Sequence, residues 1–164
     1  MGWKDGLTEQ TKSAYKAAEG LIAMLHEENL DWKPPTGENW MTVGQLLEHL
    51  VNSCGLLMRW FVTDAWDLSH NEMLPAEKMK TIGSLVEAKD RLAKDKEIAF
   101  ETLAGLTDED LCDRMVAAPW NPTPQPLGTQ LGFMVAHLES HKSQLFYYMK
   151  LMGKPVHTGH LWGV

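Results

Sequence analysis

The chain has few cysteines and no cluster of basic residues. Its two cysteines, Cys54 and Cys112, stand far apart and form no CxxC motif. Two cysteines are too few for a disulfide framework, which predicts free thiols in a cytoplasmic protein. A formal net charge of −7 without a block of Lys or Arg argues against nucleic acid and anionic membranes as partners. Small molecules and protein surfaces remain as ligands.

Long apolar runs, repeats and strand-like alternation are absent as well. No apolar run approaches the length of a transmembrane helix, and the first thirty residues lack the basic start and apolar core of a signal peptide. No internal repeat or low-complexity segment interrupts the 164 residues. The sequence therefore predicts a single soluble domain over residues 1–164 that is built from helices.

Apolar residues recur at helical spacing in four segments. The predicted helices run from Leu7 to about Glu28, from a capping box at Thr42–Gln45 to Phe61, from a capping box at Ser84–Glu87 to near Gly105, and from Pro126 to Gly153. Gly153 is predicted to be a left-handed C-cap. Four amphipathic helices predict an all-α four-helix bundle, in which residues 63–82 form a long crossover connection.

Proline and glycine mark the segments between these helices. Residues 29–39 are predicted to be an extended loop, and residues 107–115 to hold one short helical turn. The segment APWNPTPQPLG, from Ala118 to Gly128, is predicted to be a loop without regular structure. The third helix places Asp95 or Lys96 where an apolar residue is expected, which indicates either the wall of a site or a hydrated seam.

The last helix carries two histidines, His137 and His141, at spacing i and i+4, so both imidazoles share one face. Glu139 points to the opposite side, which excludes an HExxH zinc-protease motif. A catalytic metal site usually has three protein ligands. His49 is the best third ligand because it lies on the inward face of the second helix. The weaker candidates stand near a helix end or in irregular segments: His26, His70, His157 and His160.

Further polar residues follow the same face of the last helix, namely Gln130, Gln144 and Tyr148. A structural interior would not tolerate so polar a stripe, so the stripe indicates a functional site. Asn52 and Gln144 each follow a proposed ligand by three residues and could hydrogen-bond a substrate, as could Tyr148. A solvent-facing amide is the competing interpretation for Asn52 and Gln144.

The remaining apolar residues of interest are interpreted as structural. Cys54 lies well round the helix from His49 and is predicted to be a buried core thiol. Five residues of the last helix are predicted to pack in the bundle or to form a dimer seam, with an aromatic substrate pocket as the weaker alternative: Phe133, Met134, Phe146, Tyr147 and Met149.

A histidine within GQLLEHLVNS followed by HLESHKSQLFYYMKLMGKP resembles the DinB-like (YfiT-like) superfamily of metal-binding four-helix bundles, as does DWKPPTGENWMTVGQLLEHL. The resemblance implies a divalent metal, zinc or nickel in most members, held by three histidines, here His49, His137 and His141. It also implies a homodimer and, where the chemistry is known, transfer or isomerisation with a low-molecular-weight thiol such as bacillithiol or mycothiol.

The function hypothesis is a metal-dependent thiol S-transferase that acts on small electrophiles, with Asn52, Gln144 and Tyr148 as candidate donors to the acceptor. A three-histidine site stays cationic and could lower the pKa of a bound thiol. Three alternatives remain open. The site could activate water in a hydrolase, the bundle could be a non-catalytic metal-binding or ligand-binding stress-response protein, or the three histidines could be structural.

Overall fold

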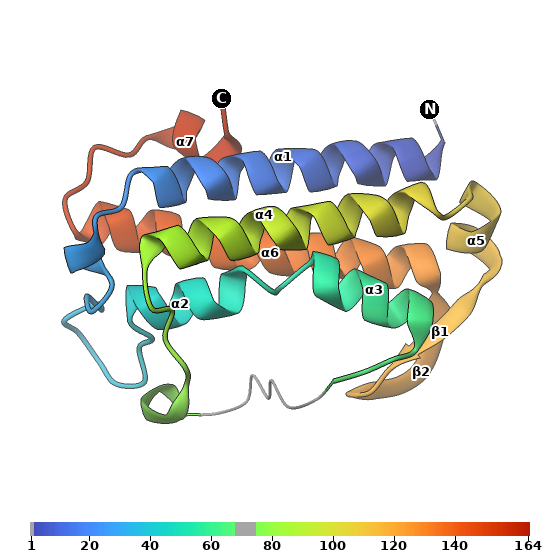
Figure 1. Cartoon of the computed structure of the whole chain (residues 1–164), viewed down its shortest axis with the longest axis horizontal. Helices are drawn as coiled ribbons and strands as arrows, with labels where there is room; N and C mark the ends of the chain where they lie inside the picture. The colour runs from blue at the N-terminus through green and yellow to red at the C-terminus, as the bar shows by residue number, and fades with distance from the viewer. Residues whose placement is uncertain (1, 68–74) are drawn as a thin grey trace.

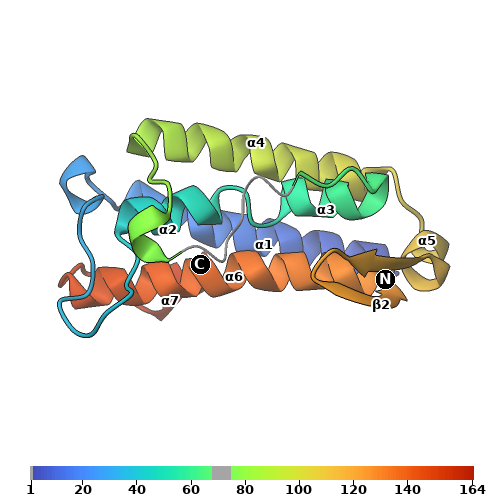
Figure 2. The same ribbon diagram turned by 90° about the horizontal axis from the view of Figure 1, so that it is seen from below.

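The computed structural model describes residues 2–67 and 75–164, which form a bundle of helices lying side by side (Figure 1). Three long helices span the bundle: α1 (Trp3–Ala23), α4 (Leu85–Ala104) and α6 (Leu127–Leu151). Two short helices, α2 (Val43–Leu50) and α3 (Gly55–Thr63), follow one another along the fourth position (Figure 2). This arrangement confirms the predicted all-α bundle. In the described part of the chain, no helix is long and apolar enough to cross a bilayer.

Smaller elements complete the fold. Two 3-10 turns, η1 (Glu27–Asn29) and η2 (Ala76–Lys78), lie in the connections, and two short helices, α5 (Asp108–Asp113) and α7 (Thr158–Trp162), flank the bundle. The short helical turn predicted between residues 107 and 115 is confirmed as α5. Helix α7 packs on α1 and α6, within a tail in which the sequence shows no periodicity.

The helix boundaries follow the predicted capping signals. Thr42 and Gln45 form the reciprocal capping box, with hydrogen bonds of 3.2 and 2.9 Å between side chain and backbone. Ser84 caps α4, but the carboxylate of Glu87 accepts from the N–H of Gly83 instead of from Ser84. Gly153 has a φ of 76°, which confirms the left-handed C-cap. Helix α1 begins at Trp3 and ends at Ala23, so the predicted bounds of the first helix were shifted.

The prediction of one continuous second helix was wrong, because the helix is interrupted between α2 and α3. Asp95 of α4 caps the helix that follows the interruption: its carboxylate accepts hydrogen bonds from the backbone N–H of Gly55 (3.0 Å) and of Leu56 (2.8 Å). It also accepts one from the hydroxyl of Tyr15 (2.7 Å). A buried side chain from another helix therefore satisfies the free N–H groups at the start of α3.

Asp95 is 3% exposed, so it is neither a site wall nor part of a hydrated seam. Burial raises the pKa of its carboxyl, and the hydrogen bonds that it accepts offset part of this rise. The neighbouring Lys96 reaches outward instead and pairs with Glu19 at 2.9 Å. The polar residue on the inward face of the third helix is thus a cap for α3.

Gly55 allows the backbones of α3 and α4 to come close together. A Cβ atom at this position would lie 1.9 Å from the carbonyl oxygen of Asp95 and 2.9 Å from the backbone nitrogen of Ala99. Both neighbours are backbone atoms of α4, so a side-chain rotation cannot relieve the clash. The crossing of these two helices therefore requires glycine at position 55.

The segment predicted as a loop without regular structure forms a β-hairpin, so this prediction was wrong. Strand β1 (Met115–Ala118) pairs antiparallel with β2 (Asn121–Pro126), in a register that places Met115 opposite Pro126 and Ala118 opposite Asn121. The prolines of β2 occupy every second position, so their nitrogens all face one edge of the ribbon. Because both strands of a two-stranded ribbon are edge strands, prolines are tolerated there.

The interior contains the apolar faces of all the long helices. Cys54 is fully buried, as predicted, and burial raises the pKa of its thiol; it and Cys112 are both free. In the last helix, Phe146, Met149 and Met134 lie in the core as predicted. The crossover connection lies partly outside the described residues, and His70 falls in that part.

Candidate metal centre

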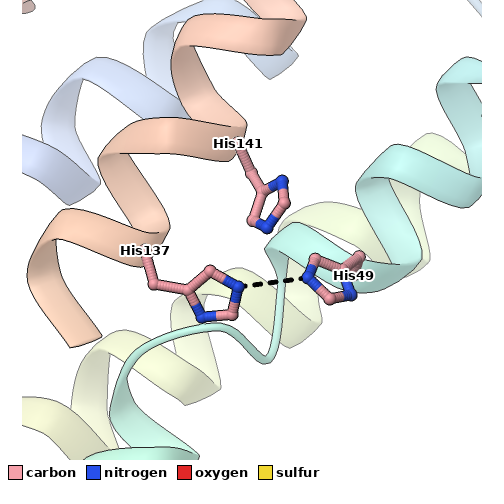
Figure 3. Close-up of side chains that lie close together, drawn as sticks. All are labelled: His49, His137 and His141. Carbon is pink, nitrogen blue, oxygen red and sulfur yellow. Dashed lines mark hydrogen bonds between the residues drawn. The ribbon is translucent and has the colours of Figure 1, made fainter. Parts of the chain in front are cut away.

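Three histidines from two helices point toward one another (Figure 3). His49 comes from the last turn of α2, and His137 and His141 come from α6. The Nε2 atoms of His49 and His137 are 3.2 Å apart. The ring centroid of His141 lies 4.2 Å from that of His49 and 4.7 Å from that of His137. One ring nitrogen of each residue lies within 4.8 Å of the others.

This spacing fits a divalent metal ion. A zinc–nitrogen bond of about 2.0–2.1 Å in tetrahedral geometry places two ligand nitrogens about 3.3 Å apart, close to the 3.2 Å between His49 and His137. The nitrogen of His141 lies within 4.8 Å of the other two, and small side-chain rotations would bring it to the same spacing. A set of imidazole ligands suits zinc or nickel. The cluster could therefore hold a metal ion.

The second ring nitrogens of two histidines are held by oxygen atoms. Nδ1 of His137 lies 3.1 Å from the carbonyl oxygen of Ser53, and Nδ1 of His141 lies 2.7 Å from Oε1 of Gln144. Because these oxygens can only accept, each Nδ1 carries the proton and each Nε2 presents a lone pair to the cluster. Outer hydrogen bonds of this kind orient metal-binding histidines in known sites.

The histidines are held in the neutral form that binds metals. Burial, together with the neighbouring imidazoles of His141 and His137, lowers the pKa of His49 to about 3. Burial and His141 lower the pKa of His137 to about 4, although the Ser53 carbonyl opposes the shift. Burial also lowers the pKa of His141. All three rings are thus uncharged at neutral pH, when their lone pairs are available.

The break between α2 and α3 contributes to the geometry of the cluster. His49 lies in the last turn of α2, and Ser53 lies in the break itself. Since Ser53 is outside a continuous helix, its carbonyl is free to accept from His137 across the bundle. The role of Ser53 could not be predicted from the sequence, because the acceptor is a backbone atom and any residue type supplies it.

The candidate donors to a substrate lie in three different surroundings. Gln144 contacts His141 directly. Nδ2 of Asn52 lies 3.4 Å from the carbonyl of Glu48, one turn back along the chain. Tyr148 is only 3% exposed, and its hydroxyl donates to the carbonyl of Met41 (3.1 Å).

The nearest carboxylate in the sequence is bound by an arginine. Glu48 precedes His49, and both of its oxygens accept hydrogen bonds from Arg91 of α4, at 2.6 and 2.8 Å. The candidate ligand group consists of His49, His137 and His141 without an Asp or Glu side chain. The described residues therefore give this centre a purely imidazole ligand set.

The other described histidines lie elsewhere. His26 is exposed and precedes η1. His157 and His160 belong to the region of α7, and their rings pair with each other at a centroid distance of 3.9 Å. Lys142 holds α7 in place by donating to the carbonyl of Leu161 (3.0 Å). Lys142 follows His141 directly on α6 and is directed to another side of that helix, so α7 covers a face of α6 other than that of the metal centre.

The structure thus combines a helical bundle with a three-histidine cluster between its helices that could hold a metal ion. Residues 10–145 match the DinB superfamily, and the chain belongs to this superfamily. The resemblance seen in the sequence is thereby confirmed. A search of curated proteins found no match.

Two solved structures share the fold. A DinB-like protein of Bacillus subtilis superposes with a TM-score of 0.68 at 20% sequence identity, covering 92% of this chain and 94% of that protein. A conserved protein of Enterococcus faecalis superposes with a TM-score of 0.73 at 18% identity, covering 94% of this chain and 99% of that protein. At these identities the comparison supports the bundle fold.

Proposed function

We propose that this protein is a divalent-metal-dependent enzyme that transfers a low-molecular-weight thiol to small electrophiles. The convergence of His49, His137 and His141 within 4.8 Å carries the proposal. Membership of the DinB superfamily supports it, because the resemblance implies a metal at these residues and thiol chemistry where a reaction is known. The metal is proposed to be zinc or nickel, and the thiol to resemble bacillithiol or mycothiol.

A divalent ion held by the three histidines would lower the pKa of a bound thiol, because a cation stabilises the thiolate. In the proposed reaction the thiolate sulfur forms a bond to the electrophilic carbon of the acceptor. The leaving group departs with its bonding electron pair, and the thiol proton passes to solvent. The residues around the site contribute orientation: the Ser53 carbonyl and Gln144 fix the rings of His137 and His141.

The ligand surroundings favour a thiol over water as the nucleophile. A free thiol has a pKa of about 8.5, whereas that of water is about 15.7, so a thiol needs far less activation. A hydrolase would gain from a carboxylate base, but the candidate group contains only histidines, and Glu48 is bound by Arg91. Hydrolysis remains the alternative reaction of the same centre.

The acceptor requires hydrogen-bond donors as well as the nucleophile. We propose that the amides of Asn52 and Gln144 approach it, with Gln144 also serving His141. Tyr148 is proposed as a further donor, although it first has to release the carbonyl of Met41. Of the three, Gln144 is the one that hydrogen-bonds to a candidate ligand, His141.

Metal analysis tests the first step of this proposal. Protein purified without a histidine tag is expected to contain about one zinc or nickel ion per chain, the stoichiometry of a single three-histidine site. His49→Ala and His137→Ala should each lose the metal, whereas His26→Ala, which changes an exposed histidine, should retain it. Absence of metal after reconstitution, with the fold intact by circular dichroism, would exclude the metal-dependent reaction.

Thiol consumption tests the second step. The metal-loaded protein should accelerate the reaction of a low-molecular-weight thiol with 1-chloro-2,4-dinitrobenzene, and chelation should abolish the acceleration. Bound metal without any metal-dependent turnover would instead support a non-catalytic metal-binding or ligand-binding bundle. The same preparations would show whether the histidines are structural, since His49→Ala would then lose stability without a change in bound metal.

We also propose that the protein forms a homodimer, as the resemblance implies. Tyr147 is 60% exposed and Leu151 is 65% exposed, and both lie on α6. Such apolar side chains would be covered in a dimer. Light scattering coupled to size-exclusion chromatography should then give twice the chain mass of 18.5 kDa, and a monomer at micromolar concentration would contradict the proposal.

A further inference from the structure

A pocket of about 170 Å³ lies between the β-hairpin and the first half of α6, and the metal centre does not include it. Its lining is dominated by amide and aromatic side chains together with one thioether: Trp120, Asn121, Gln125, Gln130, Phe133 and Met134. None of these side chains carries a charge, although the chain as a whole has a formal net charge of −7. The pocket therefore suits an uncharged ligand.

The size and the walls of the pocket point to a single ring. An engineered cavity of about 150 Å³ binds benzene, and this pocket is of similar volume. Drug-sized ligands occupy pockets of about 300–1,000 Å³, so the space accepts one ring or one end of a longer molecule. Trp120 and Phe133, which are 60% and 52% exposed, supply aromatic faces for it to stack against.

Gln130 gives the pocket a specific polar group. Its side chain is only 5% exposed, and within residues 2–67 and 75–164 its amide makes no hydrogen bond to another residue. Among the described residues no fully buried side-chain nitrogen or oxygen lacks a partner, so the unbonded side-chain amide of Gln130 keeps contact with solvent, and Gln130 lines the pocket. A hydrogen-bonding substituent on a bound ring could take the place of this solvent.

The hairpin is fixed on the bundle at both ends. At its tip, Trp120 packs edge-on against Phe61 and Trp66, with ring centroids 6.2 and 5.5 Å apart. At its base, Arg114 donates from Nη2 to the carbonyl of Val62 (2.6 Å). Because these contacts join the hairpin to α3 and the segment that follows it, the pocket is formed before a ligand enters, which lowers the entropic cost of binding.

The pocket and the histidine cluster share one face of α6. Gln130, Phe133 and Met134 precede His137 by seven, four and three residues, the spacings that place side chains on one face of a helix. With a rise of about 1.5 Å per residue, the floor of the pocket lies about 5–10 Å from His137 along the helix axis. A ligand ring in the pocket could therefore carry a substituent that reaches the metal centre.

We propose that this pocket is the acceptor subsite, which binds the aromatic ring of an uncharged electrophile and donates a hydrogen bond from Gln130 to a carbonyl, amide or nitro oxygen on that ring. The position of the subsite beside the thiol rests on the proposed transferase function. Binding of the ring itself depends only on the pocket and requires neither metal nor thiol.

Benzamide is a suitable probe, because it combines one ring with one amide and carries no charge. In ¹H–¹⁵N NMR titrations of the full chain, benzamide is expected to shift the Trp120 indole and Gln130 amide signals in a saturable way. Gln130→Leu preserves the size of the side chain and should raise the Kd about three- to tenfold, the effect of one net hydrogen bond. Benzoate, with a similar shape but a negative charge, should bind at least about tenfold more weakly, the size of effect expected when a charge is buried unpaired.

The control is Val86→Ala, which removes an exposed apolar side chain of α4 that does not line the pocket. This variant should bind benzamide with an unchanged Kd. Lack of saturable shifts at Trp120 and Gln130 would overturn the assignment. So would a Gln130→Leu variant that is folded by circular dichroism and binds benzamide as tightly as the wild type.

Kinetics separate failure of the subsite from failure of the proposed function. Gln130→Leu should raise KM for 1-chloro-2,4-dinitrobenzene about three- to tenfold and leave KM for iodoacetamide, which has no ring, unchanged. Saturable benzamide binding without metal-dependent thiol turnover would support ligand binding in the pocket and contradict the proposed transferase activity. Turnover without benzamide binding would support the transferase activity and contradict the assignment of the pocket as its acceptor subsite.

Discussion

Gln144 contacts the candidate metal centre through its hydrogen bond of 2.7 Å to Nδ1 of His141. Gln144→Leu removes the acceptor and leaves the ring of His141 free to rotate. Loss of such an outer hydrogen bond typically lowers metal affinity about 10- to 100-fold, so competition titration with a chromophoric chelator should show a loss of this size. Ser140→Ala is the matched control on α6, because the Ser140 hydroxyl donates to the carbonyl of Ala136 in its own helix. An unchanged affinity in Gln144→Leu would show that Gln144 does not orient the ligand.

The histidine cluster also predicts how the stability of the metal-free protein depends on pH. The folded-state pKa values of His49 and His137, about 3 and about 4, lie below the ordinary value of 6.5. Between these pH values the unfolded chain binds more protons than the folded one. The contribution of the neutral histidines to the free energy of unfolding is therefore fully present above about pH 6.5 and is lost as the pH is lowered toward 4. Urea denaturation of metal-free protein at pH 7.5 and pH 5 measures the fall.

His49→Gln is the variant that isolates this contribution from the carboxylates that also titrate. It replaces the titrating ring with an uncharged amide, so its free energy of unfolding should decrease less between pH 7.5 and pH 5 than that of the wild type. An equal decrease in the two proteins would mean that His49 does not keep its lowered pKa in the metal-free state.

At the scale of single residues, helical spacing was sufficient to bring three histidines together. The i and i+4 spacing of His137 and His141 follows from the helix period, and His49 was placed by its phase on the apolar face of its own helix. Their role as metal ligands stays a prediction. Phe133 was predicted to pack in the bundle or form a dimer seam, with an aromatic pocket as the weaker alternative. It is 52% exposed and lines the hairpin pocket, so it does not pack in the core, and its place in a dimer seam stays a prediction.

At the scale of elements, the break between α2 and α3 is the feature that the sequence could not reveal. The apolar stripe continues through residues 51–54, so periodicity alone favours one helix. The side chain that caps α3 after the break is Asp95, which lies 40 residues after Gly55 in the sequence. The hairpin was missed for a different reason: prolines normally argue against strands, and only a ribbon with two edges accommodates them.

Asp95→Ala tests the cap of α3. The change removes the acceptor of the Leu56 N–H and of the Tyr15 hydroxyl, and one of the two acceptors of the Gly55 N–H, which also donates to the Tyr15 oxygen (3.1 Å). Loss of a helix cap together with buried unsatisfied donors should lower the free energy of unfolding by about 2–4 kcal/mol, measured by urea denaturation. Lys96→Ala, which removes a partly exposed ion pair with Glu19, should cost less than about 1 kcal/mol. Equal losses in the two variants would contradict the assigned role of Asp95.

At the scale of the whole molecule, the candidate ligands join parts of the chain that are far apart in sequence, since His49 and His137 are separated by 88 residues. The unfolded chain does not present them together, so a metal ion held by this cluster would bind the folded state selectively. Free metal at 100 times its Kd should then raise the free energy of unfolding by about 2.7 kcal/mol. Thermal denaturation with and without zinc measures the gain, and EDTA should reverse it.

His49→Ala is the control for this linkage, because it removes the contribution of α2 to the cluster and should leave the melting temperature insensitive to zinc. An equal gain in this variant would place the stabilising ion elsewhere on the protein. Together with metal analysis, the comparison assigns the ion to the interface between α2 and α6.

The close approach of α3 and α4 at Gly55 also constrains how this sequence can change over evolution. A Cβ atom at position 55 would meet the backbone of Asp95 and Ala99, so no replacement at another side chain can compensate for the loss of glycine. At the same helix crossing, the carboxylate of Asp95 accepts a hydrogen bond from the backbone N–H of residue 55. In an alignment of relatives, positions 55 and 95 are therefore expected to vary together: lineages that lose the glycine should lose the aspartate as well. Frequent relatives with a larger residue at 55 and an aspartate at 95 would contradict this expectation.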